Sequence, residues 1–313
     1  MTKRILSVVL SLVMVLSLLP AGLVTAEGSE HIHCMCGQTK TKDATCADCG
    51  TKAVVWTGVD ALSSTTAPGN YYFTKNISVD PWFITSGEYA FCLCGHNLTS
   101  GSAGKRIIDV AGEGVKLTLT DCGAQVGSVT GATGASATGS ALCVSTQAQL
   151  NLYNIKVTGN KAATNGVILV ARGGTFNMYS GQIVGNETGR GAIYVQDDNC
   201  VANLLGGTIT GNHAKNTGNT AGGGGVYGMK GVINLGGDIQ IVGNTSAGRE
   251  PDLYIRNDQG AKLQLSTVKS MVHGAKVRYN IWTAETDTAN LKSVTGAPAA
   301  WSSSWLQIGR AHV

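Results

Sequence analysis

The chain has 313 residues, a formal net charge of +4 and 13% charged residues, which is about half the usual charged share. It contains no basic stripe or polybasic cluster, so the composition argues against a nucleic-acid partner and against an anionic lipid surface. Glycine is abundant, with 43 residues, whereas proline is rare, with 5, and this combination favours regular β-structure with many tight turns.

Residues 1–26 predict a secretory signal peptide. Lys3 and Arg4 form a basic start, Ile5–Leu19 is an apolar core, and Val24–Ala26 offers a small-residue cleavage pattern. The apolar core is shorter than the stretch of about 20 residues that spans a membrane, so cleavage is favoured over an uncleaved anchor. We therefore expect a secreted or cell-surface protein with no membrane span after signal removal.

Residues 27–52 form a Cys/His-rich module with two similar halves, His33-Cys34-Met35-Cys36-Gly37 and Cys46-Ala47-Asp48-Cys49-Gly50. In each half two candidate ligands stand three positions apart, and glycine follows the second. This spacing resembles the paired knuckles of a zinc ribbon, which implies a structural tetrahedral Zn²⁺. The predicted ligands are His33, Cys36, Cys46 and Cys49, with Cys34 as the alternate to His33. Disulfides are the competing interpretation, because exported proteins are commonly oxidised.

Residues 53–114 predict irregular, β-rich N-terminal coils or a cap, and residues 115–265 predict a regular repeat. Within the repeat nearly the same ten residues occur four times: N-L-Y-N-I-K-V-T-G-N (151–160), N-M-Y-S-G-Q-I-V-G-N (177–186), N-L-L-G-G-T-I-T-G-N (203–212) and N-L-G-G-D-I-Q-I-V-G-N (234–244). The closing Gly-Asn pairs begin at Gly159, Gly185, Gly211 and Gly243. The first two steps are equal, and the third is longer because it contains a glycine-rich insertion, His213–Gly223. A fixed period in this range indicates a solenoid.

Three short apolar segments recur in each period. One alternates as in Ile193-Tyr194-Val195, the second as in Phe176-Asn177-Met178, and the third precedes each Gly-Asn pair. Alternation with period two is typical of strands, with the outer residues of each triplet on one face and the middle residue on the other. Three strands per turn of about 26 residues predict an all-β fold, a parallel β-helix, and the preference of parallel crossovers makes it right-handed.

The same stacking predicts files of identical side chains along the axis. Tight corners at the Gly-Asn pairs require positive φ, which both residues tolerate. One file of asparagines should form a hydrogen-bonded ladder, and a second should lie on an outer face. The first file is Asn160, Asn186, Asn212 and Asn244, and the second is Asn151, Asn177, Asn203 and Asn234.

A candidate ligand-binding surface comes from the middle residues of three successive triplets, Tyr194, Tyr227 and Tyr254. We expect them to form an exposed aromatic column, with rings spaced by the strand separation of about 4.8 Å, on which sugars or a partner surface bind. In the alternative interpretation the rings only stabilise neighbouring strands or pack under the insertion His213–Gly223.

The segment G-G-T-F-N-M-Y-S-G-Q-I-V-G-N (173–186) resembles repeats of large secreted β-helix proteins from Gram-positive gut bacteria. Gly191-Ala192-Ile193 and Ile183-x-x-Asn186 are similar to the G-G-A-I and F-x-x-N repeats of polymorphic outer-membrane adhesins, although Arg190 replaces the first glycine and Ile183 replaces phenylalanine. The resemblance covers about residues 142–255 and implies a pectin-lyase-like fold. That fold hosts enzymes, adhesins and passive stalks, so the resemblance leaves the activity open.

Asp197 and Asp198 directly follow a predicted strand and are the candidate catalytic pair. Galacturonan hydrolases with this fold carry N-x-D, D-D, G-H-G and R-x-K motifs in that order, and paired carboxylates serve them as acid and base. Here Arg256-Asn257-Asp258 follows the pair without an intervening G-H-G, and Gly95-His96 lies upstream instead. A solvated turn is therefore the competing interpretation of the two aspartates.

Residues 266–307 predict terminal coils or the start of a truncated domain. The segment 308–313 resembles the conceptual translation of a sequencing-adapter read, in which case the natural protein continues past Gln307; an ordinary tail is the alternative. Taken together, the sequence predicts a secreted, non-catalytic protein for adhesion or recognition, with an extracellular glycan or a cell-surface component as its partner. The alternative is a carbohydrate-active enzyme, either a polysaccharide lyase or a glycoside hydrolase of the pectin-lyase-like group.

Overall fold

The structure, a computed structural model, describes residues 30–102, 105–134, 140–216, 223–247, 252–269, 276–282 and 306–308. The chain divides into two compact units, Met1–His31 and Ile32–Val313. The predicted signal peptide and residues 309–313 of the suspected artefact lie outside the described residues. Across the described ranges, no helix is long and apolar enough to cross a membrane.

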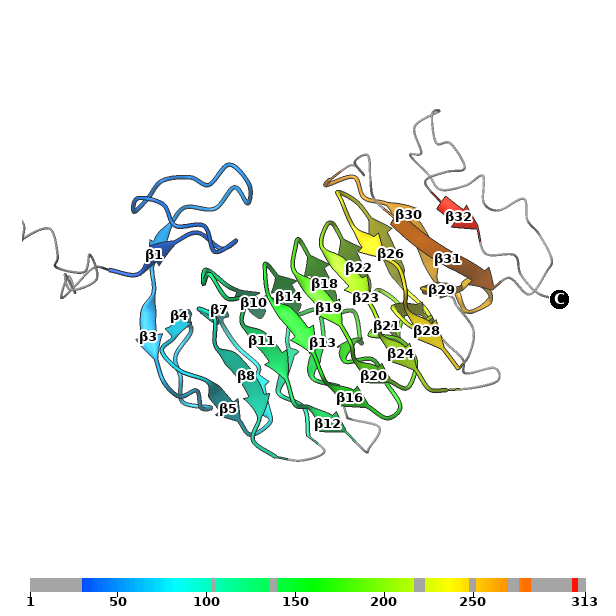
Figure 1. Cartoon of the computed structure of the whole chain (residues 1–313), viewed down its shortest axis with the longest axis horizontal. Helices are drawn as coiled ribbons and strands as arrows, with labels where there is room; N and C mark the ends of the chain where they lie inside the picture. Colours follow the sequence, from blue (N-terminus) through cyan, green and yellow to red (C-terminus); the bar gives the residue numbers. More distant parts are fainter. Residues whose placement is uncertain are drawn as a thin grey trace, which may run out of the picture. The chain divides into compact units, whose positions relative to one another are not determined.

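The described residues form an all-β fold with long parallel sheets, plus the 3-10 turn η2 (Asn257–Gln259). Figure 1 shows strands of successive repeats lying side by side in chain order. One sheet has nine strands, all paired in parallel. They are β3 (Thr57–Val59), β4 (Gly69–Phe73), β7 (Glu88–Cys92), β10 (Lys116–Thr120), β14 (Gln149–Leu152), β18 (Thr175–Met178), β22 (Val201–Leu204), β26 (Val232–Leu235) and β30 (Lys262–Leu265).

A second sheet has sixteen strands arranged as two parallel runs joined through β31 (Lys276–Trp282), which also pairs with β32 (Leu306–Ile308). The first run is β5 (Ile77–Val79), β8 (Asn97–Ser100), β11 (Ser128–Thr130), β15 (Lys156–Thr158), β19 (Gln182–Val184), β23 (Thr208–Thr210) and β27 (Gln240–Ile241). The second run is β6 (Trp82–Ile84), β9 (Ile108–Ala111), β13 (Leu142–Ser145), β17 (Ile168–Val170), β21 (Ile193–Val195), β25 (Val226–Gly228) and β29 (Leu253–Arg256).

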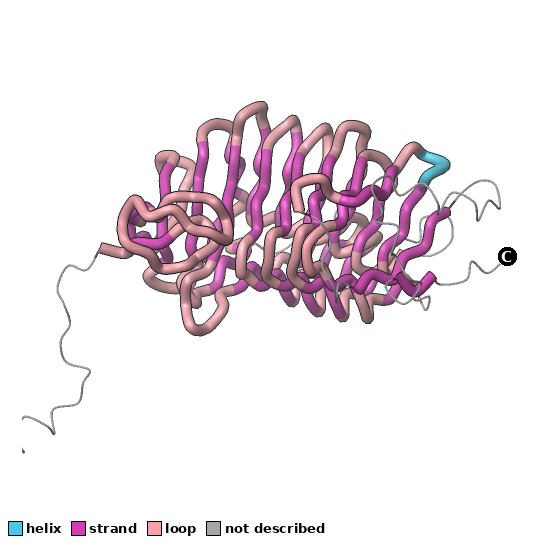
Figure 2. Tube along the Cα trace, turned by 90° about the horizontal axis from the view of Figure 1, so that it is seen from above, coloured by secondary structure: helices cyan, strands magenta, loops and turns pink. Residues whose placement is uncertain are grey.

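Two smaller sheets complete the described structure. A five-stranded parallel sheet contains β12 (Thr133–Gly134), β16 (Lys161–Ala162), β20 (Glu187–Thr188), β24 (His213–Ala214) and β28 (Thr245–Ser246). In the Cys/His module, β1 (Ile32–His33) pairs with β2 (Val54–Val55) in the antiparallel sense. Figure 2 shows the strands of successive repeats running alongside one another, with loops between them.

The predicted register is confirmed. Asn151 pairs with Asn177, Asn177 with Asn203, and Asn203 with Asn234, each between parallel neighbours. The glycines of the four Gly-Asn pairs have φ between 62° and 72°, as a sharp corner requires.

The number of strands per repeat differs from the expectation of three. After each of the four Gly-Asn pairs the chain forms one further strand, and these four strands together with β12 build the five-stranded sheet. Each is only two residues long, so it carries too little alternation to be visible in the sequence. Each repeat therefore contributes four strands.

Strands of residues 53–114 pair into the same two sheets as the strands of the later repeats. β4 and β7 belong to the same nine-stranded sheet as the later repeats, and β5, β6, β8 and β9 belong to the sixteen-stranded sheet. This region lacks the Gly-Asn signature, so its membership in the repeat is not visible from the sequence. The apolar residues that face inward from both sheets form one continuous core, and side chains such as Leu150, Phe176 and Ile193 are completely buried.

Both predicted files of asparagine are present. In the inner file each side-chain oxygen accepts from the backbone N–H and Nδ2 of the preceding asparagine, at 2.9–3.1 Å for the three links from Asn160 to Asn244. In the second file each Nδ2 donates to the preceding oxygen at 2.7–2.8 Å. Inner-file residues are at most 1% exposed, whereas Asn203 and Asn234 of the second file are half-buried.

Candidate functional site

The Cys/His module holds four cysteines in one small cluster. Cys34 and Cys46 are buried, and Cys36 and Cys49 are half-buried. Both halves of the module turn in a similar way, because the Gly37 N–H donates to the Cys34 carbonyl at 2.9 Å and the Gly50 N–H donates to the Cys46 carbonyl at 2.8 Å. The two turns direct all four sulfurs inward.

The four sulfur atoms lie within 4.8 Å of one another. The distance between the Sγ atoms of Cys34 and Cys36 is 3.3 Å, and that between the Sγ atoms of Cys36 and Cys46 is 3.6 Å. A tetrahedral ion with Zn–S bonds of about 2.3 Å places its sulfurs about 3.8 Å apart, so the cluster fits Zn²⁺ with little adjustment. These four cysteines are free thiols in the structure.

This ligand set contains the alternate residue Cys34 and does not contain His33. The physical reason is that His33 ends the strand β1 and Cys34 directly follows it, and successive side chains of an extended chain point to opposite sides. His33 therefore points away from the cluster, while Cys34, the next residue, points into it. Cys36, Cys46 and Cys49 lie in the cluster as predicted.

The thiols of the cluster differ in acidity. Burial opposes ionisation of Cys49, but hydrogen bonds from the Thr51 hydroxyl and backbone and from Cys36 outweigh it and lower the pKa to about 6. Burial raises the pKa of the Cys34 and Cys36 thiols. Cys49 therefore ionises more readily than Cys34 and Cys36, and a divalent cation would favour loss of the thiol protons when it binds.

The predicted tyrosine column is present in register but it is not exposed. Tyr194 pairs with Tyr227 and Tyr227 with Tyr254, with ring centroids 5.3 and 5.6 Å apart. Tyr194 is 3% exposed and Tyr227 is 1% exposed, so the expectation of an open aromatic platform is wrong.

The Arg190 side chain covers the column. Its guanidinium carbon lies 5.0 Å from the Tyr194 ring centroid and 5.8 Å from that of Tyr227, which are cation–π distances. The same guanidinium donates to the Tyr194 hydroxyl at 3.1 Å, and this hydroxyl lies 3.0 Å from the Met229 sulfur. Arg190 therefore covers the rings of Tyr194 and Tyr227, and Met229 contacts the Tyr194 hydroxyl.

An open pocket of about 380 Å³ lies next to Arg190, Tyr194 and Met229. It is lined by Asn165, Arg190, Tyr194, Gln196, Asp197, Met229 and Lys230. The structure thus places one predicted ligand-binding residue, Tyr194, and one predicted catalytic residue, Asp197, at the same pocket. Tyr227 and Tyr254 do not line it.

The two candidate catalytic aspartates have separate structural partners. Asp197 accepts a hydrogen bond from the Arg172 backbone N–H at 2.9 Å, which stabilises the positive φ of 48° at Arg172. Asp198 is exposed and forms an ion pair with Lys230 at 2.9 Å. The two carboxylates are thus held by different partners, and of the two only Asp197 borders the pocket described above.

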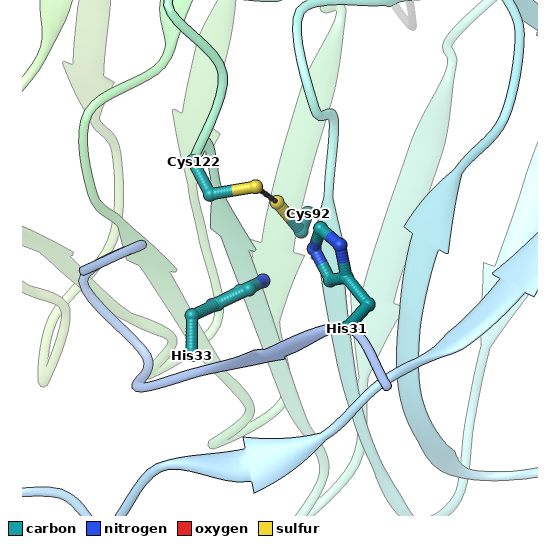
Figure 3. Close-up of side chains that lie close together, drawn as sticks. All are labelled: His31, His33, Cys92 and Cys122. Carbon is teal, nitrogen blue, oxygen red and sulfur yellow. Dashed lines mark hydrogen bonds between the residues drawn. The ribbon is translucent and has the colours of Figure 1, made fainter. Parts of the chain in front are cut away.

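A second group of candidate metal ligands was not predicted from the sequence. It contains His31, His33, Cys92 and Cys122, whose ligand atoms also lie within 4.8 Å of one another (Figure 3). The sequence carried only a faint signal for it, since Cys122-Gly123 repeats the Cys-Gly pairs of the module whereas Cys92 is followed by leucine. Because the histidines and the cysteines of this group are far apart in the sequence, their spacing did not indicate a common site.

Comparison of the chain with models of protein families, with curated proteins and with solved structures gave no match.

Proposed function

We propose that this chain is a secreted or cell-surface, right-handed parallel β-helix protein that recognises an acidic extracellular glycan. The parallel register of the repeats supports the β-helix, because each step from Asn151 to Asn177 and from Asn177 to Asn203 returns the chain to the same sheet in the same direction. Parallel connections of this kind are right-handed in about 98% of cases. The basic-then-apolar N-terminus supports export.

In this proposal Cys34, Cys36, Cys46 and Cys49 hold a structural Zn²⁺. A closed set of four thiolates leaves no position for substrate, so the ion's contribution is to folding. The module needs such a contribution, because its own buried apolar cluster is small and consists of Cys34, Cys46 and Ala53. The bound ion would supply the stability that so short a segment cannot obtain from a hydrophobic core.

The observation that carries the recognition function is the pocket at Arg190, Tyr194 and Lys230. Among the pocket residues Arg190 and Lys230 are cations and Asp197 is the single carboxylate, while Asp198, which pairs with Lys230, lies outside the lining. This lining favours an anionic ligand. The guanidinium is a planar fork that suits carboxylate or sulfate groups. Asn165 and Gln196 add amide donors and acceptors of the kind that orient sugar hydroxyls.

The stacked strands explain why this pocket is rigid enough for recognition. Tyr194 is in β21, whose neighbours β17 and β25 are both paired along its full length. Asp197 ties the end of the same strand to the Arg172 turn of the previous repeat. A pocket held by regular strands loses little conformational entropy when a ligand binds.

Binding of the purified protein to polygalacturonate and to a neutral glucan, followed by calorimetry, tests this function. We expect binding to polygalacturonate only, and Lys230→Gln should weaken it roughly tenfold, since hydrogen bonds to charged groups are worth about 1.5–3 kcal/mol. Lys215→Gln is the matched control, because Lys215 is likewise paired with one carboxylate, that of Glu187, but does not line the pocket. Equal effects of the two substitutions, or binding to neither polymer, would count against the proposal.

A second candidate function is cleavage of an acidic polysaccharide, and it is favoured by the position of Asp197 beside two cations in the pocket. A carboxylate there can act as general base or acid. Incubation with polygalacturonate followed by analysis of chain length distinguishes the two functions. Shortened chains that disappear with Asp197→Asn would establish the enzyme, whereas intact polymer with measurable affinity would establish the binder.

A further inference from the structure

We propose that His33, Cys92 and Cys122, together with His31, form a second Zn²⁺ site that fastens the Cys/His module to the nine-stranded sheet. The two sulfurs come from the ends of two adjacent strands of that sheet, one from the last residue of β7 and one from the turn after β10. Cys92 is the last residue of β7 and pairs with Thr120, the last residue of β10, and Cys122 follows two positions later. The sulfurs lie 3.2 Å apart.

The histidines approach these sulfurs from the module. His33 ends β1 and is 1% exposed, and His31 immediately precedes the strand. As residues i and i+2 of an extended segment, they share one side of it. Figure 3 shows both imidazoles directed toward the pair of sulfurs. Two imidazoles and two thiols are the donor set of Cys₂His₂ zinc sites.

The His33 ring has the tautomer that a metal ligand requires. Its Nδ1 lies 2.8 Å from the Cys34 carbonyl oxygen. A carbonyl oxygen only accepts, so Nδ1 carries the proton and Nε2 carries the lone pair. Ligating histidines commonly donate their other ring N–H to a backbone carbonyl in this way.

The orientation of the ring is fixed by its surroundings. The imidazole stacks on the Trp56 indole with ring centroids 4.1 Å apart and an angle of 21° between the planes. The indole N–H in turn donates to the His33 carbonyl at 2.9 Å. A ligand whose rotamer is locked in the absence of metal loses little entropy on binding it.

The cysteine side of the site is equally well held. Asp121, which precedes Cys122, is completely buried, and its carboxylate accepts three backbone N–H groups, those of Gly95, Gly123 and Gly127, at 2.6–2.9 Å. These bonds fix the turn that carries Cys122. Cys94 lies beside it, with its sulfur 3.6 Å from that of Cys122, and is a neighbouring thiol outside the group of four.

The two proposed ions would have different roles. The four-cysteine site closes the module on itself, whereas the second site joins β1 to β7 and β10, which are far from it in the sequence. A clip between such distant segments restricts the unfolded chain strongly. The second site therefore makes the docking of the module dependent on metal.

The test is the zinc content of the purified full-length protein and its variants, measured by mass spectrometry of the metal. We expect two Zn²⁺ per chain in the wild type and one in Cys122→Ser and in His33→Gln. Cys46→Ser should lose the other ion, so that failure of the four-cysteine site and failure of this site are distinguishable. Cys200→Ser, at a buried cysteine outside both groups, should keep two.

Circular dichroism of each variant shows whether it is folded, and Cys122→His, which keeps a ligand, should restore the second ion if a Cys122→Ser variant unfolds. Loading with Co²⁺ gives an independent readout, because Cys122→Ser should retain only the spectrum of the four-sulfur centre. One Zn²⁺ per wild-type chain that is insensitive to Cys122→Ser would overturn the proposal. Recovery of a Cys92–Cys122 disulfide from the unreduced protein would overturn it as well.

Discussion

Replacing Asn186 with alanine removes one member of the inner asparagine file, and the structure allows the loss of stability to be estimated. The Asn186 oxygen accepts from the Asn160 backbone N–H at 3.0 Å. Its Nδ2 donates to the carbonyl of Val157 at 3.0 Å and to the Asn212 oxygen at 2.9 Å. The residue is 1% exposed, so water cannot replace these partners.

The Asn160 N–H would remain buried without an acceptor, which costs about 1–3 kcal/mol, and each lost hydrogen bond adds about 1 kcal/mol. We therefore expect Asn186→Ala to lower the free energy of unfolding by about 3 kcal/mol. Asn203→Ala is the matched control. It removes the same atoms from the second file, where Asn203 is half-buried and joins Asn177 and Asn234. Water can replace part of that ladder, so its cost should be about 1 kcal/mol.

Urea denaturation followed by circular dichroism measures both values, provided that the dependence on urea concentration is unchanged. The two positions lie in successive repeats, so the same cooperative segment reports on both. Because the deleted atoms are identical, the difference between the variants reports the burial and the backbone partners of the inner position. A difference below about 0.5 kcal/mol would refute the argument that burial makes the inner file the stronger one.

The remaining predictions concern docking and pH. Gly37 has φ +82°, and a Cβ there would lie 1.9 Å from the Asp121 carbonyl oxygen, so Gly37→Ala should displace the module and lower its thermal stability. Gly50→Ala, with φ +68° but no atom within 4 Å, should cost only about 1–2 kcal/mol from its backbone conformation. Hydrogen bonds from Arg256 lower the pKa of Asp258 from 3.8 to about 2. That stabilisation is present above pH 4 and is lost as the pH falls through about 2, so Asp258→Asn should cost about 1 kcal/mol at pH 6 and nothing at pH 1.5 in chemical denaturation.

Much of the repeat could be predicted because it depends on local patterns that recur. The Gly-Asn corners reveal the period, and the alternation around Asn151, Asn177 and Asn203 reveals strands. The register of these strands follows because residues at equivalent positions of successive repeats pair with each other. The two-residue strands such as β16 could not be found in this way. These strands are recognised only by their pairing with the neighbouring repeat, because a strand of two residues is too short to show alternation in the sequence.

The candidate site could be predicted less well from the sequence, because it depends on contacts between side chains from different segments of the chain. The alternation correctly placed Tyr194 and Tyr227 on the outer side of their strands, but it contained no information about Arg190, which reaches over both rings. The spacing His33-x-x-Cys36 matched that of Cys46-x-x-Cys49, yet the strand at β1 turns His33 toward Cys92 and Cys122. Contacts between segments so far apart in the chain are set by docking, which spacing does not encode.

The end of the inner file shows how a local rule and a distant contact combine. The file has a direction, because every asparagine accepts from the preceding repeat and donates to the following one. Its last member, Asn244, donates from its N–H and Nδ2 to a carboxylate oxygen of Asp252 at 2.6 and 2.9 Å. In the earlier repeats this position must both accept and donate, which requires an amide. The last acceptor is not followed by another asparagine to which it must donate, so a carboxylate can take this position. Asp252 lies only 8 residues beyond Asn244, outside the Gly-Asn period, and it directly precedes β29. The residue that completes the file therefore also leads the chain into the next strand of the sixteen-stranded sheet.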